Sequence, residues 1–258
     1  GGLNSINNRI GVVIVKLHHA FFLVMLAIVP LMPSSAEAID RNYSKNGWEF
    51  VSLTAFLGMP TLDLQDFNSW IDSSVPDEAG GSVSYVDPDY EWGLRLGYDG
   101  HWPLRLGLGY SRILASGGGT FSSGEFSIEV PTSIIDFSVL YLLAPEGNLN
   151  FGLGMSRGWA KVFGRFDGSE ETPEGIYQLG FDFKSGGGVF SGFAEGEYQL
   201  GRAGAICLEG GYRVNQLSEV EVQNGSTLKL DGSDVKISCS GFFIRAGLRL
   251  NFHWLEFG

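Results

Sequence analysis

Beyond residue 32 the sequence has no apolar run long enough to cross a bilayer as a helix, so any membrane-spanning part of that region must consist of strands. Basic residues are scarce. The 17 Lys and Arg stand against 29 Asp and Glu, for a net charge of −12, which argues against a nucleic-acid-binding protein. Two cysteines and four histidines offer no cluster with metal-ligand spacing. We therefore predict no metal, no cofactor and no nucleic-acid partner.

The first 38 residues have the pattern of a secretory signal peptide. Arg9 and Lys16 precede an apolar run at residues 20–32, and Ala36 and Ala38 form a small-x-small cleavage site. The apolar core is too short for a typical spanning helix, although a retained anchor is the alternative. We predict a signal peptide at residues 1–38 and one domain at residues 39–258.

Residues 91–110 alternate strictly between two kinds of side chain, which predicts two strands joined by the short turn DGHWP. One face of the hairpin is apolar or aromatic, made by Trp92, Leu94, Leu96, Tyr98, Leu104, Leu106, Leu108 and Tyr110. The other face carries mostly glycines and isolated charges. Such a face suits the crowded lumen of a small closed barrel, which leaves the apolar face for lipid.

The same alternation recurs at residues 48–59, 126–143, 149–163, 189–200, 205–215 and 235–252, which gives eight strands in all. In the strand at 126–143 it slips by one near Pro131, which predicts a bulge. Connections after the second, fourth and sixth strands are short, whereas the others are long and polar. This segregation predicts an all-β fold, an eight-stranded antiparallel transmembrane β-barrel with up-and-down connectivity.

These segments, together with the C-terminal stretch FFIRAGLRLNF, resemble the small outer-membrane β-barrel proteins of the OmpA, OmpX and OmpW type. The resemblance covers residues 39–258 and implies a monomer in the cell outer membrane with both termini periplasmic. It also implies contact with outer-membrane lipid and lipopolysaccharide, and handling by the barrel-assembly machinery. One departure is that Phe257 is penultimate, whereas such chains usually end on an aromatic residue.

The inward positions of these strands predict a balanced network of buried charges. A narrow lumen tolerates charges only if they pair, because an unpaired buried charge is costly. The predicted network consists of Glu91, Arg95, Arg105, Glu129, Glu195, Glu197, Glu209, Arg213, Arg245 and Arg249.

A lumen closed by such a network predicts a structural or surface-interaction role. The alternative is a narrow channel for small solutes or hydrophobic molecules, lined by the same residues. Enzymes exist on related barrels, but their acid–base chemistry typically recruits a histidine at the outer end. After the predicted signal peptide only His101 and His253 occur, both at the predicted periplasmic rim, so we predict no catalytic residues and no enzyme.

The long connection at residues 61–89 has no Lys or Arg and could hold divalent cations or meet a cationic partner. Its spacing matches no calcium loop, so a solvated acidic loop is the simpler interpretation. Its acids are Asp63, Asp66, Asp72, Asp77, Glu78, Asp87 and Asp89. In the last loop Asn224-Gly225 is a hairpin signal that predicts a projecting extension of the last two strands. We expect Cys207 and Cys239 to be buried, unbridged thiols.

Overall fold

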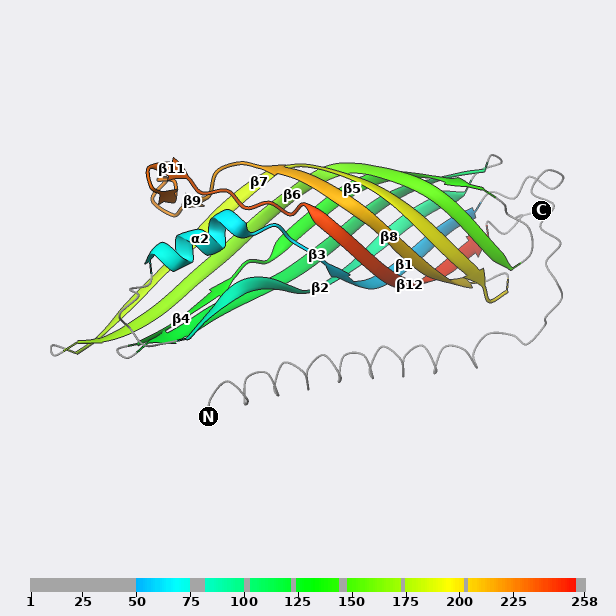
Figure 1. Ribbon diagram of the computed structural model, residues 1–258. Coiled ribbons are helices and arrows are strands. Elements are labelled where there is room, and N and C mark those ends of the chain that lie inside the picture. Colours follow the sequence, from blue (N-terminus) through cyan, green and yellow to red (C-terminus); the bar gives the residue numbers. More distant parts are fainter. Residues whose placement is uncertain are drawn as a thin grey trace.

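A computed structural model describes residues 50–74, 82–99, 103–121, 124–143, 148–172, 175–201 and 204–253. The predicted signal peptide, His101 and Phe257 lie outside these residues. The described chain is a long, tilted β-barrel with one short helix at one end (Figure 1). Within the described residues no helix is long and apolar enough to cross a membrane.

The barrel wall is a ring of eight antiparallel strands. Each strand pairs with the next along the wall, and β1 closes the ring by pairing with β12 from Phe50↔His253 to Pro60↔Phe243. β4 and β5 occupy one position in the ring, because β3 and β6 each pair with both. The wall strands are β1 (Phe50–Pro60), β2 (Ser82–Asp99), β3 (Leu104–Phe121), β4 (Gly124–Glu129), β5 (Thr132–Leu142), β6 (Leu149–Thr172), β7 (Gly175–Gln199), β8 (Gly204–Leu217) and β12 (Gly241–His253).

The two ends of the barrel differ. At one end, the turn end, short segments join β2 to β3, β5 to β6 and β7 to β8. At the other, the loop end, β6 and β7 run well beyond β1 and β12 (Figure 1). β1 pairs with β2 only as far as Gly58↔Glu91, so beyond that point the wall consists of β2, β3, β4, β6 and β7.

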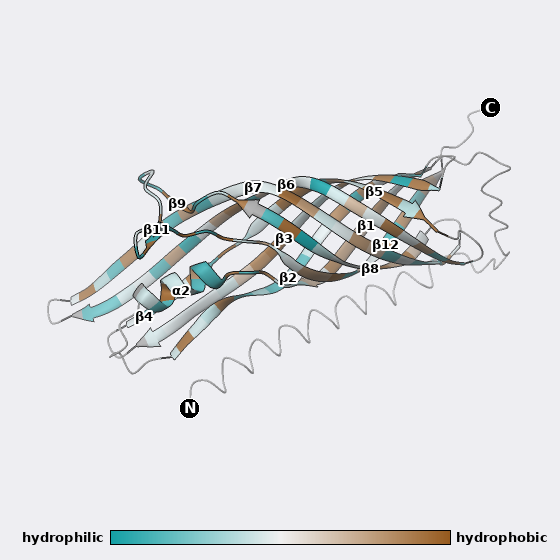
Figure 2. Cartoon of the chain, turned by 45° about the horizontal axis from the view of Figure 1, so that its top comes forward, coloured by the Kyte–Doolittle hydropathy of each residue, from teal (hydrophilic) through white to brown (hydrophobic). Residues whose placement is uncertain are grey.

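Near the turn end the burial pattern is the reverse of that in a soluble protein. In β2, Glu91 and Arg95 are buried while Leu96 is 50% exposed. The colours in Figure 2 alternate accordingly along the strands. Polar residues inside and apolar residues outside are the arrangement expected of a barrel surrounded by lipid.

In the loop-end half the pattern returns to that of a soluble protein. The inward side chains of Ile128, Val162 and Phe183 are buried in an apolar core, and the outward neighbours of Ile128 are Ser127 and Glu129. The helix α2 (Gln65–Ser74) packs Phe67 and Ile71, one turn apart, into this core. Val220, Val235 and Ile237 enter it from the chain between β8 and β12. The loop end is therefore filled by the protein's own chain, which we call the apolar plug (residues 61–74 and 218–240).

Small inward glycines make room for large inward rings. Phe56 is paired with Gly93, Phe193 with Gly154, Phe183 with Gly164 and Phe243 with Gly211. In each pair a Cβ built on the glycine would collide with the phenyl ring opposite. The glycine-rich inner face thus seats a small number of aromatic rings.

Several predicted boundaries change. The bulge predicted near Pro131 is wrong, because β4 and β5 keep one register with β3 and with β6 on both sides of the proline. Residues 235–240 belong to the apolar plug and not to the last strand, which begins at Gly241. β9 (Glu221–Val222) pairs with β7, and β10 (Lys229–Leu230) pairs with β11 (Ser233–Asp234). Asn224-Gly225 therefore closes a small separate turn and does not extend β8 and β12.

Candidate functional site

The interior of the turn-end half is a continuous network of ion pairs. Nine of the ten predicted network residues are buried inside the wall, on β2, β3, β7, β8 and β12. Strict alternation along each strand brings them there, because successive side chains point to opposite faces. The nine are Glu91, Arg95, Arg105, Glu195, Glu197, Glu209, Arg213, Arg245 and Arg249.

The part of the network nearest the turn end joins β2, β3, β7 and β12. Arg105 Nε lies 2.7 Å from Asp99 Oδ1, and its Nη1 lies 2.9 Å from Glu195 Oε1 and 3.0 Å from Glu197 Oε2. Arg249 Nη2 lies 2.7 Å from Glu195 Oε1, and Nη1 pairs with Glu197. Two arginines are therefore held among three carboxylates.

The part nearer the loop end joins β2, β8 and β12. Glu91 Oε1 lies 2.6 Å from Arg245 Nη2 and 2.9 Å from Arg213 Nη2. Glu209 accepts from Arg245 at 3.0 Å and from Arg95 at 2.6 Å. Arg95 also lies 3.6 Å from Glu195, which links the two parts. Apart from Arg105–Asp99 and Arg245–Glu209, which join neighbouring strands, these ion pairs cross the lumen between strands that are not neighbours in the wall.

Inward phenyl rings pack against the guanidinium groups of the network. The Arg245 guanidinium carbon lies 4.4 Å from the ring centroid of Phe243 and 4.6 Å from that of Phe56. Arg95 lies 5.3 Å from the ring centroid of Phe193. Such contacts stabilise a guanidinium that has lost its water. These are the rings that the paired glycines seat.

The apolar plug packs inside the wall on the loop-end side of the network. The side chain of Asn68 on α2 accepts a hydrogen bond from Val86 N at 3.0 Å and donates one to Val86 O at 3.3 Å. The amide thereby pairs with the backbone N–H and C=O of Val86, in a stretch of β2 to which β1 is not hydrogen-bonded. Near this point β2 is irregular against β3, with register shifts on both sides of Asp87 and Pro88. Asn68 thus fixes the helix across the open side of the wall.

Comparison with known proteins gives matches of fold only. No protein-family model matches the chain, and no curated protein sequence matches it. Among solved structures, OprG from Pseudomonas aeruginosa matches at 13% identity and a TM-score of 0.42, over 82% of this chain and 99% of that one. Neisserial surface protein A matches at 14% and 0.38, over 79% and 97%. The outer membrane protease OmpT from Escherichia coli matches at 12% and 0.40, over 81% and 97%.

The closed ring and the reversed burial near the turn end decide the fold class. The fold is that of a small outer-membrane β-barrel. The matches are too distant in sequence and in superposition to carry an activity over to this barrel.

One predicted network residue lies elsewhere, and two residues were missed. Glu129 is exposed on the outer face of β4 and is not in the lumen. Assigning Glu129 to the lumen would put Ile128 on the outer face, whereas Ile128 is buried in the apolar core and Glu129 faces away from it. Asp99, in contrast, is buried beside Arg105. Asp136 also points inward on β5, beside Gly109.

The predicted acidic loop is not one loop. Asp63 accepts a hydrogen bond from the Gln65 N–H at the start of α2, and Asp66 lies in the first turn of that helix. Asp72 accepts from the Tyr85 hydroxyl at 3.1 Å. Asp87 and Asp89 lie on β2 itself. Asp77 and Glu78 lie outside the described residues. The described acids are spread over a helix and a strand and do not converge on a common point.

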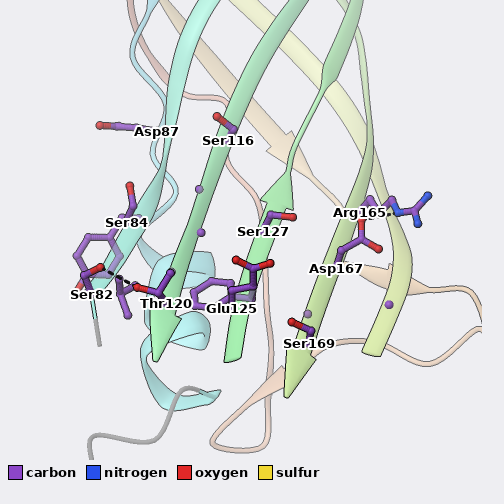
Figure 3. Close-up of a pocket in the computed structure, with 18 of the residues that line it drawn as sticks. Ser82, Ser84, Asp87, Ser116, Thr120, Glu125, Ser127, Arg165, Asp167 and Ser169 are labelled. Carbon is purple, nitrogen blue, oxygen red and sulfur yellow. Dashed lines mark hydrogen bonds and ion pairs between the residues drawn. The ribbon is translucent and has the colours of Figure 1, made fainter. Parts of the chain in front are cut away.

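A polar groove of about 1310 Å³ runs over the outer face of the loop-end sheet (Figure 3). Asp87, Ser116, Glu125, Ser127 and Asp167 are among the side chains that line it, and Arg165 borders it in an ion pair with Asp167 at 2.7 Å. Its lining is the outer polar face of a strand region whose inner face is apolar. The groove is therefore open to solvent, outside the lumen.

Within the described residues one group of three possible metal ligands lies close together, namely Glu195, Glu197 and Cys207. Both carboxylates already pair with Arg105 and Arg249. A cation would have to displace two buried guanidinium groups that carry the same sign of charge. Cys207 and Cys239 are both free and buried, as predicted.

Proposed function

We propose that this protein is an integral outer-membrane protein with a closed lumen and a structural or surface-interaction role. The turn end would face the periplasm and the loop end the outside. The described chain enters the wall at Phe50 and leaves it at His253, and these two residues are paired at the turn end. Both termini would accordingly be periplasmic, with the long strands and α2 outside the cell.

The outer surface supports a membrane location. Ile135 and Trp159 are 58% and 55% exposed, and Phe151 and Leu153 are exposed on the same side of the wall. An apolar band of this kind would be unstable in water and is favourable in lipid. Tyr98, Tyr141 and Tyr198 are exposed near the turn end, whereas Trp92 and Trp159 are exposed farther along, as expected for interfacial aromatic residues.

The proposal of a closed lumen depends on two groups of side chains that fill the interior of the barrel, one toward each end. Near the turn end, five arginines contact five carboxylates across the lumen. Toward the loop end, Phe67 and Ile71 of the helix are buried in the apolar core. A narrow conduit for small solutes or apolar molecules, the competing function, would have to open both fillings.

We also propose that the barrel is not an enzyme. Each of the five carboxylates in the ion-pair network already contacts at least one guanidinium group, so none of them is free to serve as a general acid. The one described histidine, His253, lies at the turn end of β12. The supported role is therefore one in which the lumen holds the wall together and the loop end meets the surroundings.

Conductance across a planar bilayer tests this proposal. The refolded protein should insert and give no steady single-channel steps. Steps that change in size when Arg95 or Arg245 is replaced by glutamine would show an open lumen and would contradict the closed one. Folding is checked on the same samples by heat-modifiable gel mobility and β-type circular dichroism. A chain that shows neither is not a barrel.

A further inference from the structure

Within the described residues, the outer face of the wall carries some cations that have an acidic partner and some that have none. Arg165 pairs with Asp167 at 2.7 Å and Lys184 with Glu221 at 3.1 Å. Arg112 on β3, and Arg157 and Lys161 on β6, have no ion pair within the described part of the chain. Arg112 Nε has no hydrogen-bond partner there either. In a protein of net charge −12, unpaired cations gathered on one surface need an explanation.

Strand register places two of these cations in one row. Arg112 is paired with Ser133 on β5, and Ser133 is paired with Lys161 on β6. The two Cα atoms are therefore about 10 Å apart, two strand spacings, with the serine between them. All three side chains point outward, because Ile113, Ile134 and Ala160, their sequence neighbours, are buried inside. We call Arg112, Ser133 and Lys161 the basic row.

The basic row lies close to the place where the outer surface changes from apolar to polar, with one more apolar row beyond it that includes Pro131 and the 60% exposed Phe163. The adjacent row toward the turn end consists of Tyr110, Ile135 and Trp159, paired in the same order. The Tyr110 hydroxyl lies 3.4 Å from Ser133 Oγ. Toward the loop end the outer surface carries Glu125 and Glu129. The row is thus at the height where the head groups of the surrounding lipid would lie.

The third cation lies deeper in the apolar band. Arg157 is paired with Phe137 and Phe190, one row farther from the loop end than Trp159. A long basic side chain at such a depth lays its stem on apolar surface and extends its charged end toward the head groups. Arg157 therefore adds positive charge below the basic row and is not part of it.

We propose that the basic row binds the phosphate of a phosphorylated lipid in the outer leaflet, whose acyl chains lie on Tyr110, Ile135 and Trp159. This inference rests on the proposed outer-membrane location. A guanidinium and an ammonium at this spacing can donate to different oxygens of one phosphate or to two phosphates of one head group. The apolar row beneath matches the chains of the same molecule.

The acidic residues on the solvent side of the row favour a lipid phosphate over a phosphate ion from solution. Glu125 and Glu129 are exposed on the solvent side, so a soluble anion would approach past like charges. A lipid reaches the row from the membrane side, along an apolar surface. The acidic outer surface therefore leaves the basic row accessible to anions held in the bilayer.

Native mass spectrometry of the intact refolded barrel tests the inference. The protein in detergent is offered diphosphorylated lipid A or the same lipid with its phosphates removed. We expect the phosphorylated lipid to be retained at least about tenfold better, the effect of losing one charge-assisted contact. The variant R112Q/K161Q should lose that preference. The control R165Q removes a charge that Asp167 already neutralises, and it should bind as the unaltered protein does.

Equal retention of the two lipids by the unaltered protein would overturn the inference, and this arm decides the matter even if the double variant does not fold. Loss of lipid in R165Q as large as in R112Q/K161Q would also overturn it, because the effect would then be one of overall charge. Full competition by millimolar inorganic phosphate would show a site for the free ion and would contradict a lipid site. Insertion into vesicles is measured on the same preparation. A barrel that inserts without distinguishing the lipids refutes only the basic row, whereas one that does not insert refutes the proposed function as well.

Discussion

Replacing Glu91 with glutamine should weaken the barrel more than any exposed change of the same kind. Glu91 is 0% exposed and pairs with Arg245 at 2.6 Å and with Arg213 at 2.9 Å. Arg245 Nε donates a further hydrogen bond to it at 3.2 Å. The variant keeps the shape of the side chain and removes its charge, which leaves two buried guanidinium groups short of a counter-charge.

The size of the effect follows from the number of partners. A single charge-assisted hydrogen bond contributes about 1.5–3 kcal/mol, and breaking a buried ion pair from one side costs about 3–5 kcal/mol. Glu209 still pairs with Arg245 in the variant, so that arginine is not left alone. We therefore expect the free energy of unfolding to fall by about 3–5 kcal/mol, measured by urea titration of the refolded protein in detergent or lipid vesicles.

Glu129→Gln is the matched control. Both residues were predicted to belong to the network, but Glu129 is exposed on the outer face of the loop-end half. Its replacement should change the free energy of unfolding by less than about 0.5 kcal/mol. If E91Q is as stable as the unaltered protein, or if E129Q costs as much as E91Q, then the argument from buried pairing is wrong.

Three further predictions concern the apolar plug and the inner face. Asn68→Ala removes both hydrogen bonds to Val86, so it should cost about 1–2 kcal/mol and make residues 61–74 more susceptible to limited proteolysis. The control Ser69→Ala, at an exposed position of the same helix, should not, and equal cleavage of the two variants would show that Asn68 does not hold the helix. Cys239 should resist maleimide in the folded barrel and react after denaturation. Burial raises the pKa of its thiol to about 11, so the thiol stays protonated below that pH. Rapid labelling of the folded protein at pH 8 would contradict its burial. Gly164→Ala places a Cβ against the ring of Phe183 and should lower the midpoint of urea unfolding. The double variant with Phe183→Leu should recover part of that loss. An unchanged midpoint in the single variant would contradict the tight packing of the ring on Gly164.

The alternation of apolar and polar residues correctly predicted the part of the fold in which apolar residues face outward and polar residues face inward. In the turn-end parts of β2 and β3 every second residue faces lipid, so Arg95 and Arg105 could be assigned to the lumen from the sequence. The same rule failed at Glu129 for a physical reason. Beyond the lipid the interior is filled by the protein's own apolar side chains, so apolar residues point inward and the same alternation has the reverse meaning.

The sequence held less information about the apolar plug. Residues 61–89 could be recognised as polar and acidic, but their composition does not show that Phe67 and Ile71 enter the barrel. The strand β2 reaches back to Ser82, well before the alternating stretch, because its outer end is held by β3 and Asn68 and not by a regular pattern. The basic row was missed because it depends on the register of three strands.

Along β6 the inward face changes from polar near the turn end to apolar near the loop end, and this has a practical consequence for mutational data on this protein. Between Leu149 and Trp159 the odd-numbered positions face outward among apolar residues and should reject charged side chains, whereas between Lys161 and Ser169 the even-numbered positions face the apolar plug and should reject them. A method that averages tolerance over the whole strand would find no periodicity at all. A position-by-position map would instead show the phase reverse once, and the residue at which it reverses would mark the membrane surface without any lipid being seen.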